Sequence, residues 1–193
     1  MLDRRTLIVG SVTAIAANGP VLAHKRPVSL DPIYAPQTVG ITGYDPDTIV
    51  IDPPNTFLYL VETENSARRY GVGVGRAGLA WSGEAVVGRK AKWPSWRPTA
   101  NMIRRQPRRY ARYARGVQGG PSNPLGARAL YLYRDGRDTM YRIHGTNEPW
   151  TIGQAASNGC IRLLNEHVVD LYERVSVGTP VIVLGSSVDL IIP

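Results

Sequence analysis

The pattern of apolar and polar positions near the start of the chain predicts a β-hairpin. The turn-forming segment Asp52-Pro53-Pro54-Asn55 separates two apolar runs, Thr48-Ile49-Val50-Ile51 and Thr56-Phe57-Leu58-Tyr59-Leu60-Val61. β-Branched and aromatic residues favour strands, whereas Asp, Pro and Asn favour the turn between them. We therefore expect two antiparallel neighbours in a sheet.

Further apolar segments predict additional strands. Residues 69–74, Arg-Tyr-Gly-Val-Gly-Val, alternate with period two. A second hairpin is predicted where Arg134-Asp135-Gly136-Arg137 separates residues 129–133 from residues 139–144. The run Pro180-Val181-Ile182-Val183-Leu184 predicts a last core strand. Most of the expected secondary structure is therefore β.

One clear helix is predicted in the C-terminal part. Asn165 is a suitable N-cap, and Gly178 lies just past the expected end of the helix. His167 is expected on its exposed side. Residues 99–105 predict a second, shorter helix. The helix that follows Asn165 has an apolar stripe with helical spacing, which consists of Val168, Val169, Leu171, Tyr172 and Val175.

The first 23 residues predict an export signal. Arg4 and Arg5 precede an apolar run over 7–17, and Val21-Leu22-Ala23 offers small residues for cleavage before His24. This run is shorter than the roughly 20 residues of a transmembrane helix, so we expect no transmembrane anchor in the mature chain. The arginine pair resembles a twin-arginine signal, and an ordinary secretory signal is the alternative.

The remaining chain predicts one domain after a short extension. Residues 24–45 are rich in proline, lack a periodic pattern and predict an extended N-terminal arm. Residues 46–193 contain all the predicted strands and helices, and no internal repeat divides them. Hydrophobic residues make up 43% of the chain, which is typical of a globular domain with a packed core.

The charge of the chain is positive and locally concentrated. It has 23 Lys and Arg against 15 Asp and Glu, which favours acidic partners. Seven arginines lie within residues 97–115, interleaved with Tyr110 and Tyr113, a mixture that also occurs in nucleic-acid-binding proteins. Because the chain is expected to be exported, we expect no nucleic-acid partner. A solvated face is one interpretation, and contact with an acidic glycan, a lipid head group or a carboxylate is the other.

Residues 73–78 match the letters of a dinucleotide-binding fingerprint, Gly-Val-Gly-Arg-Ala-Gly. That fingerprint requires a helix N-terminus directly after the glycines to hold a pyrophosphate. The following residues, Leu79-Ala80-Trp81-Ser82-Gly83, do not predict the start of a helix. We therefore interpret the segment as the glycine-rich end of a strand.

Cys160 is the only cysteine of the chain and is the strongest candidate for chemistry. A single cysteine excludes an internal disulfide and a multi-cysteine metal site. A thiol becomes a nucleophile as the thiolate, and a nearby imidazole can accept its proton. His144 ends a predicted strand, so a rigid backbone can aim it at the thiol. An inert buried thiol is the alternative.

The neighbours of Cys160 also suit acyl transfer. The backbone N–H groups of Gly159 and Cys160 are candidates for an oxyanion hole. Arg162 is a candidate for pairing with a substrate carboxylate, with a surface salt bridge as the alternative. Ser157 and Asn158 are candidates for binding substrate through hydrogen bonds across the site, with a role as simple turn formers as the alternative. Trp81, Trp93, Trp96 and Trp150 fit a packing role or a glycan groove, and Trp150 lies in the loop that joins the histidine to the cysteine motif.

Two segments, Ile143-His144-Gly145-Thr146 and residues 157–163 (SNGCIRL), resemble the L,D-transpeptidase catalytic domain. The resemblance extends over roughly residues 48–185. It implies a mainly β, β-sandwich-like L,D-transpeptidase catalytic fold with one clear helix after the cysteine. It also implies Cys160 as nucleophile, His144 as general base and the carbonyl of Gly145 as the group that orients the imidazole. Ser157 and Arg162 match the family motif.

One position departs from the family pattern. Many members have histidine between the serine and the glycine, where this chain has Asn158. This position is not the base, so catalysis is expected to survive. The exchange puts in doubt a second imidazole that shapes the oxyanion hole or tunes the thiolate.

The resemblance implies that the substrates are peptidoglycan peptide stems, and that no metal or organic cofactor is needed. The cysteine would attack the third residue of a tetrapeptide stem and expel D-alanine, and an amine would resolve the thioester. A second stem, a free D-amino acid or an envelope protein could supply that amine. Two alternatives stay open: a thiol carboxypeptidase or hydrolase acting on the same stems, and a non-catalytic polyanion-binding protein of the envelope. A covalent adduct with a carbapenem is also expected for this family.

Overall fold

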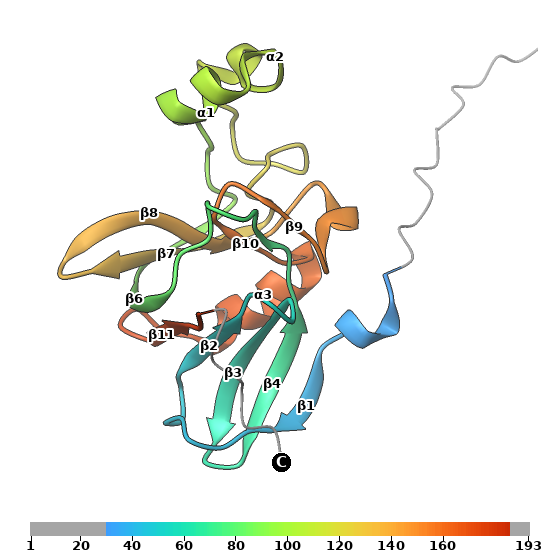
Figure 1. Cartoon of the computed structure of the whole chain (residues 1–193), viewed down its shortest axis with the longest axis vertical. Helices are drawn as coiled ribbons and strands as arrows, with labels where there is room; N and C mark the ends of the chain where they lie inside the picture. The colour runs from blue at the N-terminus through green and yellow to red at the C-terminus, as the bar shows by residue number, and fades with distance from the viewer. Residues whose placement is uncertain (1–29, 186–193) are drawn as a thin grey trace, which may run out of the picture.

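Strands dominate the computed structural model, which describes residues 30–185 (Figure 1). The expected export signal therefore lies outside the described residues. The strands of the larger sheet, in spatial order, are β1 (Gln37–Gly40), β4 (Ser66–Gly71), β3 (Phe57–Thr63), β2 (Ile49–Asp52), β11 (Pro180–Val183), β6 (Gly83–Lys92), β7 (Arg128–Arg134), β8 (Arg137–His144) and β10 (Ile161–Arg162). A small second sheet pairs β5 (Val74–Gly75) with β9 (Ala155–Ser157) in parallel.

The helices are short. They are α1 (Ala100–Arg105), α2 (Pro107–Tyr110) and α3 (Asn165–Arg174), together with 3₁₀ turns η1 (Pro32–Tyr34), η2 (Ala111–Tyr113) and η3 (Pro149–Thr151). Figure 1 shows α1 and α2 in a lobe at one end of the molecule, far from β1 and β3, while α3 lies against the sheet. Within residues 30–185, no helix is long and apolar enough to cross a membrane.

Both predicted hairpins are confirmed. Strands β2 and β3 pair antiparallel, as do β7 and β8, and β11 is the predicted last strand. The strand predicted over residues 69–74 is interrupted, because β4 ends at Gly71 and β5 begins at Val74. The fold is mainly β, as predicted.

Strands β2 and β3 are buried on both faces, which explains their nearly continuous apolar sequences. Ile49 and Leu58 face the main core, whereas Val50 and Tyr59 belong to a smaller cluster on the opposite face. Part of the expected N-terminal arm covers this second face, because Tyr34 and its neighbours pack against the smaller cluster and β1 pairs with β4. The proline-rich segment thus contributes a strand and a cover that its sequence did not indicate.

Strand β6 was missed by the sequence analysis because its residues are largely polar, small or charged. Its cationic side chains are compensated by contacts from distant elements. The guanidinium of Arg89 lies 3.5 Å from the centre of the Tyr131 ring. Lys90 Nζ donates to the carbonyls of Tyr172 and Val175 at 2.6 and 2.5 Å. These carbonyls lie at the C-terminal end of α3, where a cation is favoured by the helix dipole.

Two details of α3 differ from the predictions. Asn165 is the first helical residue and not the N-cap, a position that Leu164 occupies without a side-chain hydrogen bond. His167 is buried at 8% exposure, against the expectation that it is exposed. Its ring packs against Tyr70, with the ring centres 6.5 Å apart, because β4 covers that side of the helix.

Leu171 anchors α3 to the sheet, and its truncation tests this packing. The side chain is fully buried in the main core. Leu171→Ala should lower the free energy of unfolding by about 2–5 kcal/mol, the usual cost of a buried leucine. The matched control Val177→Ala, at a residue 62% exposed, should change it by less than about 0.5 kcal/mol. Denaturant unfolding measures both values, and similar losses in the two variants would contradict this packing.

Candidate active site

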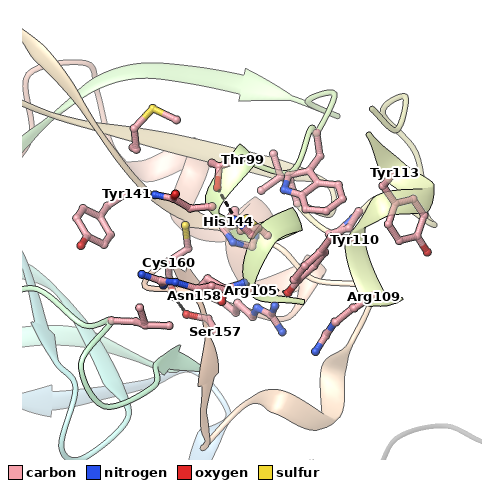
Figure 2. A pocket seen from close by; sticks show the side chains of 18 of the residues that line it. Thr99, Arg105, Arg109, Tyr110, Tyr113, Tyr141, His144, Ser157, Asn158 and Cys160 are labelled. Carbon is pink, nitrogen blue, oxygen red and sulfur yellow. Dashed lines mark hydrogen bonds between the residues drawn. The ribbon is translucent and has the colours of Figure 1, made fainter. Parts of the chain in front are cut away.

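A short parallel pairing brings the cysteine and the histidine together. Strand β10 pairs with the end of β8 in a register that places Arg162 opposite His144. The N–H of Leu163 extends the ladder by donating to the carbonyl of His144 at 2.8 Å. Cys160 immediately precedes β10, so it lies beside the last residues of β8. Both side chains line one pocket of about 540 Å³ (Figure 2).

His144 is buried at 4% exposure and held in one orientation. Its Nδ1 is hydrogen-bonded to the carbonyl oxygen of Gly145 at 2.5 Å. Because a carbonyl can only accept, Nδ1 carries the proton, and Nε2 is left with the lone pair. Burial, together with the charge of Arg162, lowers the pKa of His144 to about 3. The imidazole is therefore neutral at neutral pH and able to accept a proton at Nε2.

Cys160 is half-buried and has its own backbone partner. Burial raises the pKa of its thiol above the ordinary value. A hydrogen bond from the backbone N–H of Arg142 and the nearby guanidiniums oppose this rise. The resting site therefore contains a neutral thiol and a neutral imidazole. The thiol therefore holds its proton, and the neutral imidazole of His144 is able to accept one.

The loop before the cysteine is fixed by Ser157, which is 2% exposed. Its Oγ donates to the carbonyl of Cys160 at 2.6 Å and accepts from the N–H of Gly159 at 3.0 Å. The N–H of Gly159, one of the two expected oxyanion donors, is thus already engaged. Among the described residues the N–H of Cys160 has no partner. Ser157 therefore stabilises the conformation of the loop. Of the two expected oxyanion donors, the backbone N–H of Cys160 is the one that is free.

Gly159 is required by this loop. Its φ of +117° lies in the region that favours glycine, and a Cβ there would stand 2.6 Å from Cε1 of Tyr141 and 2.7 Å from the carbonyl oxygen of Leu79. The loop therefore packs its backbone against two other segments. Gly159 contributes shape to the site and does not itself line the pocket.

Asn165 braces the segment that follows His144. Its Oδ1 accepts from the N–H of Ala127 at 2.9 Å, and its Nδ2 donates to the carbonyl of Thr146 at 3.2 Å. The side chain expected to cap α3 instead ties the start of that helix to the residue before β7 and to the loop after the histidine. This role depends on contacts 38 and 19 residues away in sequence, which no local pattern reveals.

Arg162 lies in the pocket and is already paired. Its Nη1 is 2.8 Å from Oε2 of Glu148, and its side chain is 12% exposed. The same carboxylate is 2.9 Å from Nη2 of Arg109, which comes from α2. Glu148, a residue that the sequence analysis missed, therefore neutralises two arginines in part. A substrate carboxylate that reaches Arg162 meets a guanidinium shared with Glu148.

Asn158 connects the cysteine loop to the lobe that contains α1 and α2. Its Nδ2 donates to Oη of Tyr110 at 2.9 Å, and its Oδ1 accepts from Nη2 of Arg76 at 3.1 Å. Tyr110 is buried at 6% exposure. The residue that departs from the family pattern thus forms a bridge between three segments that surround the pocket.

The structure brings together most, but not all, of the predicted site residues. The pocket is lined by His144, Ser157, Asn158, Cys160 and Arg162, whereas Gly145 and Gly159 contact it only indirectly. Of the four tryptophans, Trp96 lines the pocket. Trp150, in the loop that joins the histidine to the cysteine motif, is 58% exposed and is not among the lining residues. Within residues 30–185, no three His, Cys, Asp or Glu side chains converge as metal ligands would.

The glycine-rich segment at residues 73–78 does not form a dinucleotide site. Gly75 ends β5, and the next residues form a turn in which the N–H of Leu79 and that of Ala80 both donate to the carbonyl of Arg76. No helix begins within this segment of the described chain. It instead contributes Gly78, Leu79 and Ala80 to the pocket wall.

Comparison with known families decides the assignment. The sequence model of the L,D-transpeptidase catalytic domain family matches residues 46–183 of this chain. The chain belongs to the L,D-transpeptidase catalytic domain family. The resemblance of the cysteine and histidine motifs is thereby confirmed at the level of the family.

Curated relatives agree with this family. The chain is 36% identical over 150 residues to the probable L,D-transpeptidase ErfK/SrfK of Escherichia coli, covering 74% of this chain and 47% of the relative. It is 38% identical over 152 residues to the probable L,D-transpeptidase YbiS of the same organism, covering 70% and 45%. The chain thus spans about half the length of these relatives.

Solved structures support the fold. A crystal structure from Brucella melitensis, of a protein named a probable carnitine operon oxidoreductase, is 57% identical, with a TM-score of 0.56, and covers 80% of this chain and 96% of that one. The L,D-transpeptidase of Mycobacterium smegmatis is 18% identical with a TM-score of 0.52, covering 72% and 58%. The oxidoreductase name belongs to the Brucella protein. The L,D-transpeptidase family shares the fold of this chain.

The neutral resting state predicts how thiol reactivity depends on pH. The pKa of Cys160 is raised, so the thiolate fraction should keep growing as the pH rises past about 9, the ordinary value. The rate of alkylation by iodoacetamide should therefore increase from pH 6 to at least about pH 9 without levelling off. Glutathione, a free thiol, is the control. A plateau near neutral pH would reveal a preformed thiolate–imidazolium pair and contradict the assignment of neutral groups.

Proposed function

We propose that this protein is a peptidoglycan L,D-transpeptidase that carries the acyl group on Cys160. The observation that supports it best is that Cys160 and an oriented, neutral His144 line one pocket of a chain that belongs to this family. Peptidoglycan lies outside the cytoplasmic membrane, so the reaction takes place in the cell envelope. The proposed export signal would deliver the chain there.

The first half-reaction forms a thioester. The sulfur of Cys160 attacks the carbonyl of the third stem residue while His144 Nε2 takes the thiol proton. The bond to the terminal D-alanine breaks, and the proton passes from His144 to the leaving amine. The carbonyl of Gly145 holds the imidazole in the required tautomer throughout. The free N–H of Cys160 donates to the oxygen of the tetrahedral intermediate.

The second half-reaction resolves the thioester. An amine attacks the acyl carbon, His144 takes a proton from that amine, and the sulfur leaves as a thiol. The product is a new amide and the free enzyme. The amine of a second stem would give a cross-link, a free D-amino acid would give exchange, and an envelope protein would become attached. Neither half-reaction requires a metal or an organic cofactor.

Mass spectrometry of muropeptides tests this proposal. Full-length, reduced protein is incubated with purified tetrapeptide muropeptides, and the products should show loss of D-alanine together with new dimers. Cys160→Ala should abolish both products, because no other thiol is present. His144→Gln should slow D-alanine release by about 10²–10⁴-fold, the usual contribution of a general base.

The matched control is His167→Gln, which changes a buried histidine that does not line the pocket. This variant should keep its activity once its folding has been verified by circular dichroism. Release of D-alanine with neither dimers nor an amide of the added amine, even when that amine is in large excess, would mean that water opens the thioester and would overturn the transferase assignment. Release that persists in Cys160→Ala would overturn the role of the cysteine.

A further inference from the structure

The arginine-rich segment forms a separate lobe over the pocket. Residues 96–117 leave the sheet after β6 and return before β7. At the base, Trp96 and Val117 exchange two backbone hydrogen bonds, of 2.9 and 2.7 Å. Figure 1 shows α1 and α2 projecting in this lobe. The closed base gives the lobe a defined position relative to the sheet.

Two contacts fix the lobe to the site. Tyr110 accepts a hydrogen bond from Asn158, and Arg109 pairs with Glu148. The ring of Trp96 packs between those of Tyr110 and Tyr113, at centre distances of 6.2 and 5.8 Å. The contacts to Asn158 and Glu148 are both made by residues of α2, so side chains of the lobe are held above the cysteine loop.

Three arginines of the lobe line the pocket, namely Arg105, Arg109 and Arg112. Figure 2 shows the first two beside the cysteine loop. Arg109 has an acidic partner in Glu148. Arg105 and Arg112 form no ion pair with any described residue. The guanidinium of Arg112 lies 4.7 Å from the centre of the Tyr113 ring, which restrains it.

The charge of the pocket is strongly unbalanced. With Arg162, four arginines line it, and Glu148 is the only acidic residue among the described lining residues. Glu148 is already shared between Arg109 and Arg162. The pocket therefore has positive charge that no protein group compensates. A ligand that contributes one or more carboxylates complements this charge.

We propose that Arg105 and Arg112 bind a side-chain carboxylate of the acyl-donor peptide. This assignment rests on the proposed function. The donor must occupy the cavity that contains Cys160 when the thioester forms, and both arginines line that same cavity. The two arginines thereby favour peptides with free side-chain carboxylates over peptides whose side-chain carboxylates are amidated.

Two donors and two double variants test the assignment. The donors are tetrapeptide stems with either free or amidated side-chain carboxylates, both with a free terminal D-alanine. Release of D-alanine gives kcat/KM for each. Arg105→Gln/Arg112→Gln should lower kcat/KM for the free-carboxylate donor by about tenfold or more, because charge-assisted hydrogen bonds are lost. With the amidated donor the change should stay within about twofold.

The matched control is Arg108→Gln/Arg115→Gln, which removes the same charge from exposed positions of the lobe outside the pocket. It should reduce kcat/KM by less than about twofold for both donors. Alkylation of Cys160 by the neutral reagent iodoacetamide should proceed at wild-type rate in both double variants, which verifies the fold around the thiol.

Three results would overturn the assignment: an equal loss for both donors, an equal loss in the control variant, or no loss at all. An equal loss in the control variant would mean that the lobe attracts anions through its overall charge. No loss at all would mean that the arginines form a solvated face. These results leave the proposed function intact, because the wild-type protein still releases D-alanine. Failure of wild-type protein to process either donor while its thiol is alkylated would overturn the proposed function and, with it, this assignment.

Discussion

The parallel pairing of β10 with the end of β8 is the constraint on which the rest of the site depends. Neighbouring strands lie about 4.8 Å apart, so the register that sets Arg162 beside His144 also brings Cys160 close to the same strand end. The following helix, α3, holds this arrangement from the other side, because Asn165 is bonded to both Ala127 and Thr146. Ile143 and Ile161, which pair here, are buried in the main core, so a change that loosens this pairing moves Cys160 relative to His144 and also disturbs the core.

Electrostatics in the pocket favours the neutral forms of the Cys160 thiol and the His144 imidazole. Burial disfavours the charged forms of Cys160 and His144, and Arg162 further disfavours a protonated imidazole. The hydrogen bond from Arg142 to the thiol and the carbonyl of Gly145 oppose these effects. Glu148 limits the influence of Arg162 by pairing with it. The site is therefore suited to a proton transfer that takes place as the thiol attacks a carbonyl, and not to a preformed thiolate–imidazolium pair.

Local sequence patterns predicted much of the fold, because both hairpins are encoded by apolar runs around turn residues. Strand β6 was missed because its charged residues are stabilised by partners on β7 and at the end of α3. The N-terminal segment was predicted only as an extended arm, although it supplies β1 and covers Val50 and Tyr59. These features depend on residues that come together only in the folded chain.

In the candidate site, too, the features set by local sequence were predicted and those that depend on distant residues were missed. The motifs around Cys160 and His144 were recognisable because the residues of each lie within a few positions of one another. Glu148 and Tyr110 were missed, since each acts through a partner on another segment: Tyr110 lies 48 positions from Asn158, and Arg109 lies 39 from Glu148. Ser157 was expected to contact substrate, but its hydroxyl is occupied within the loop.

Intact-protein mass spectrometry tests most directly whether Cys160 carries the acyl group. Full-length protein is mixed with a tetrapeptide donor in the absence of an added amine and quenched in acid at successive times within the first turnover. We expect a mass increase equal to the donor minus D-alanine, located on the peptide that contains Cys160 and removed by hydroxylamine. Loss of D-alanine with the adduct on another residue, or with no adduct at any time, would contradict it.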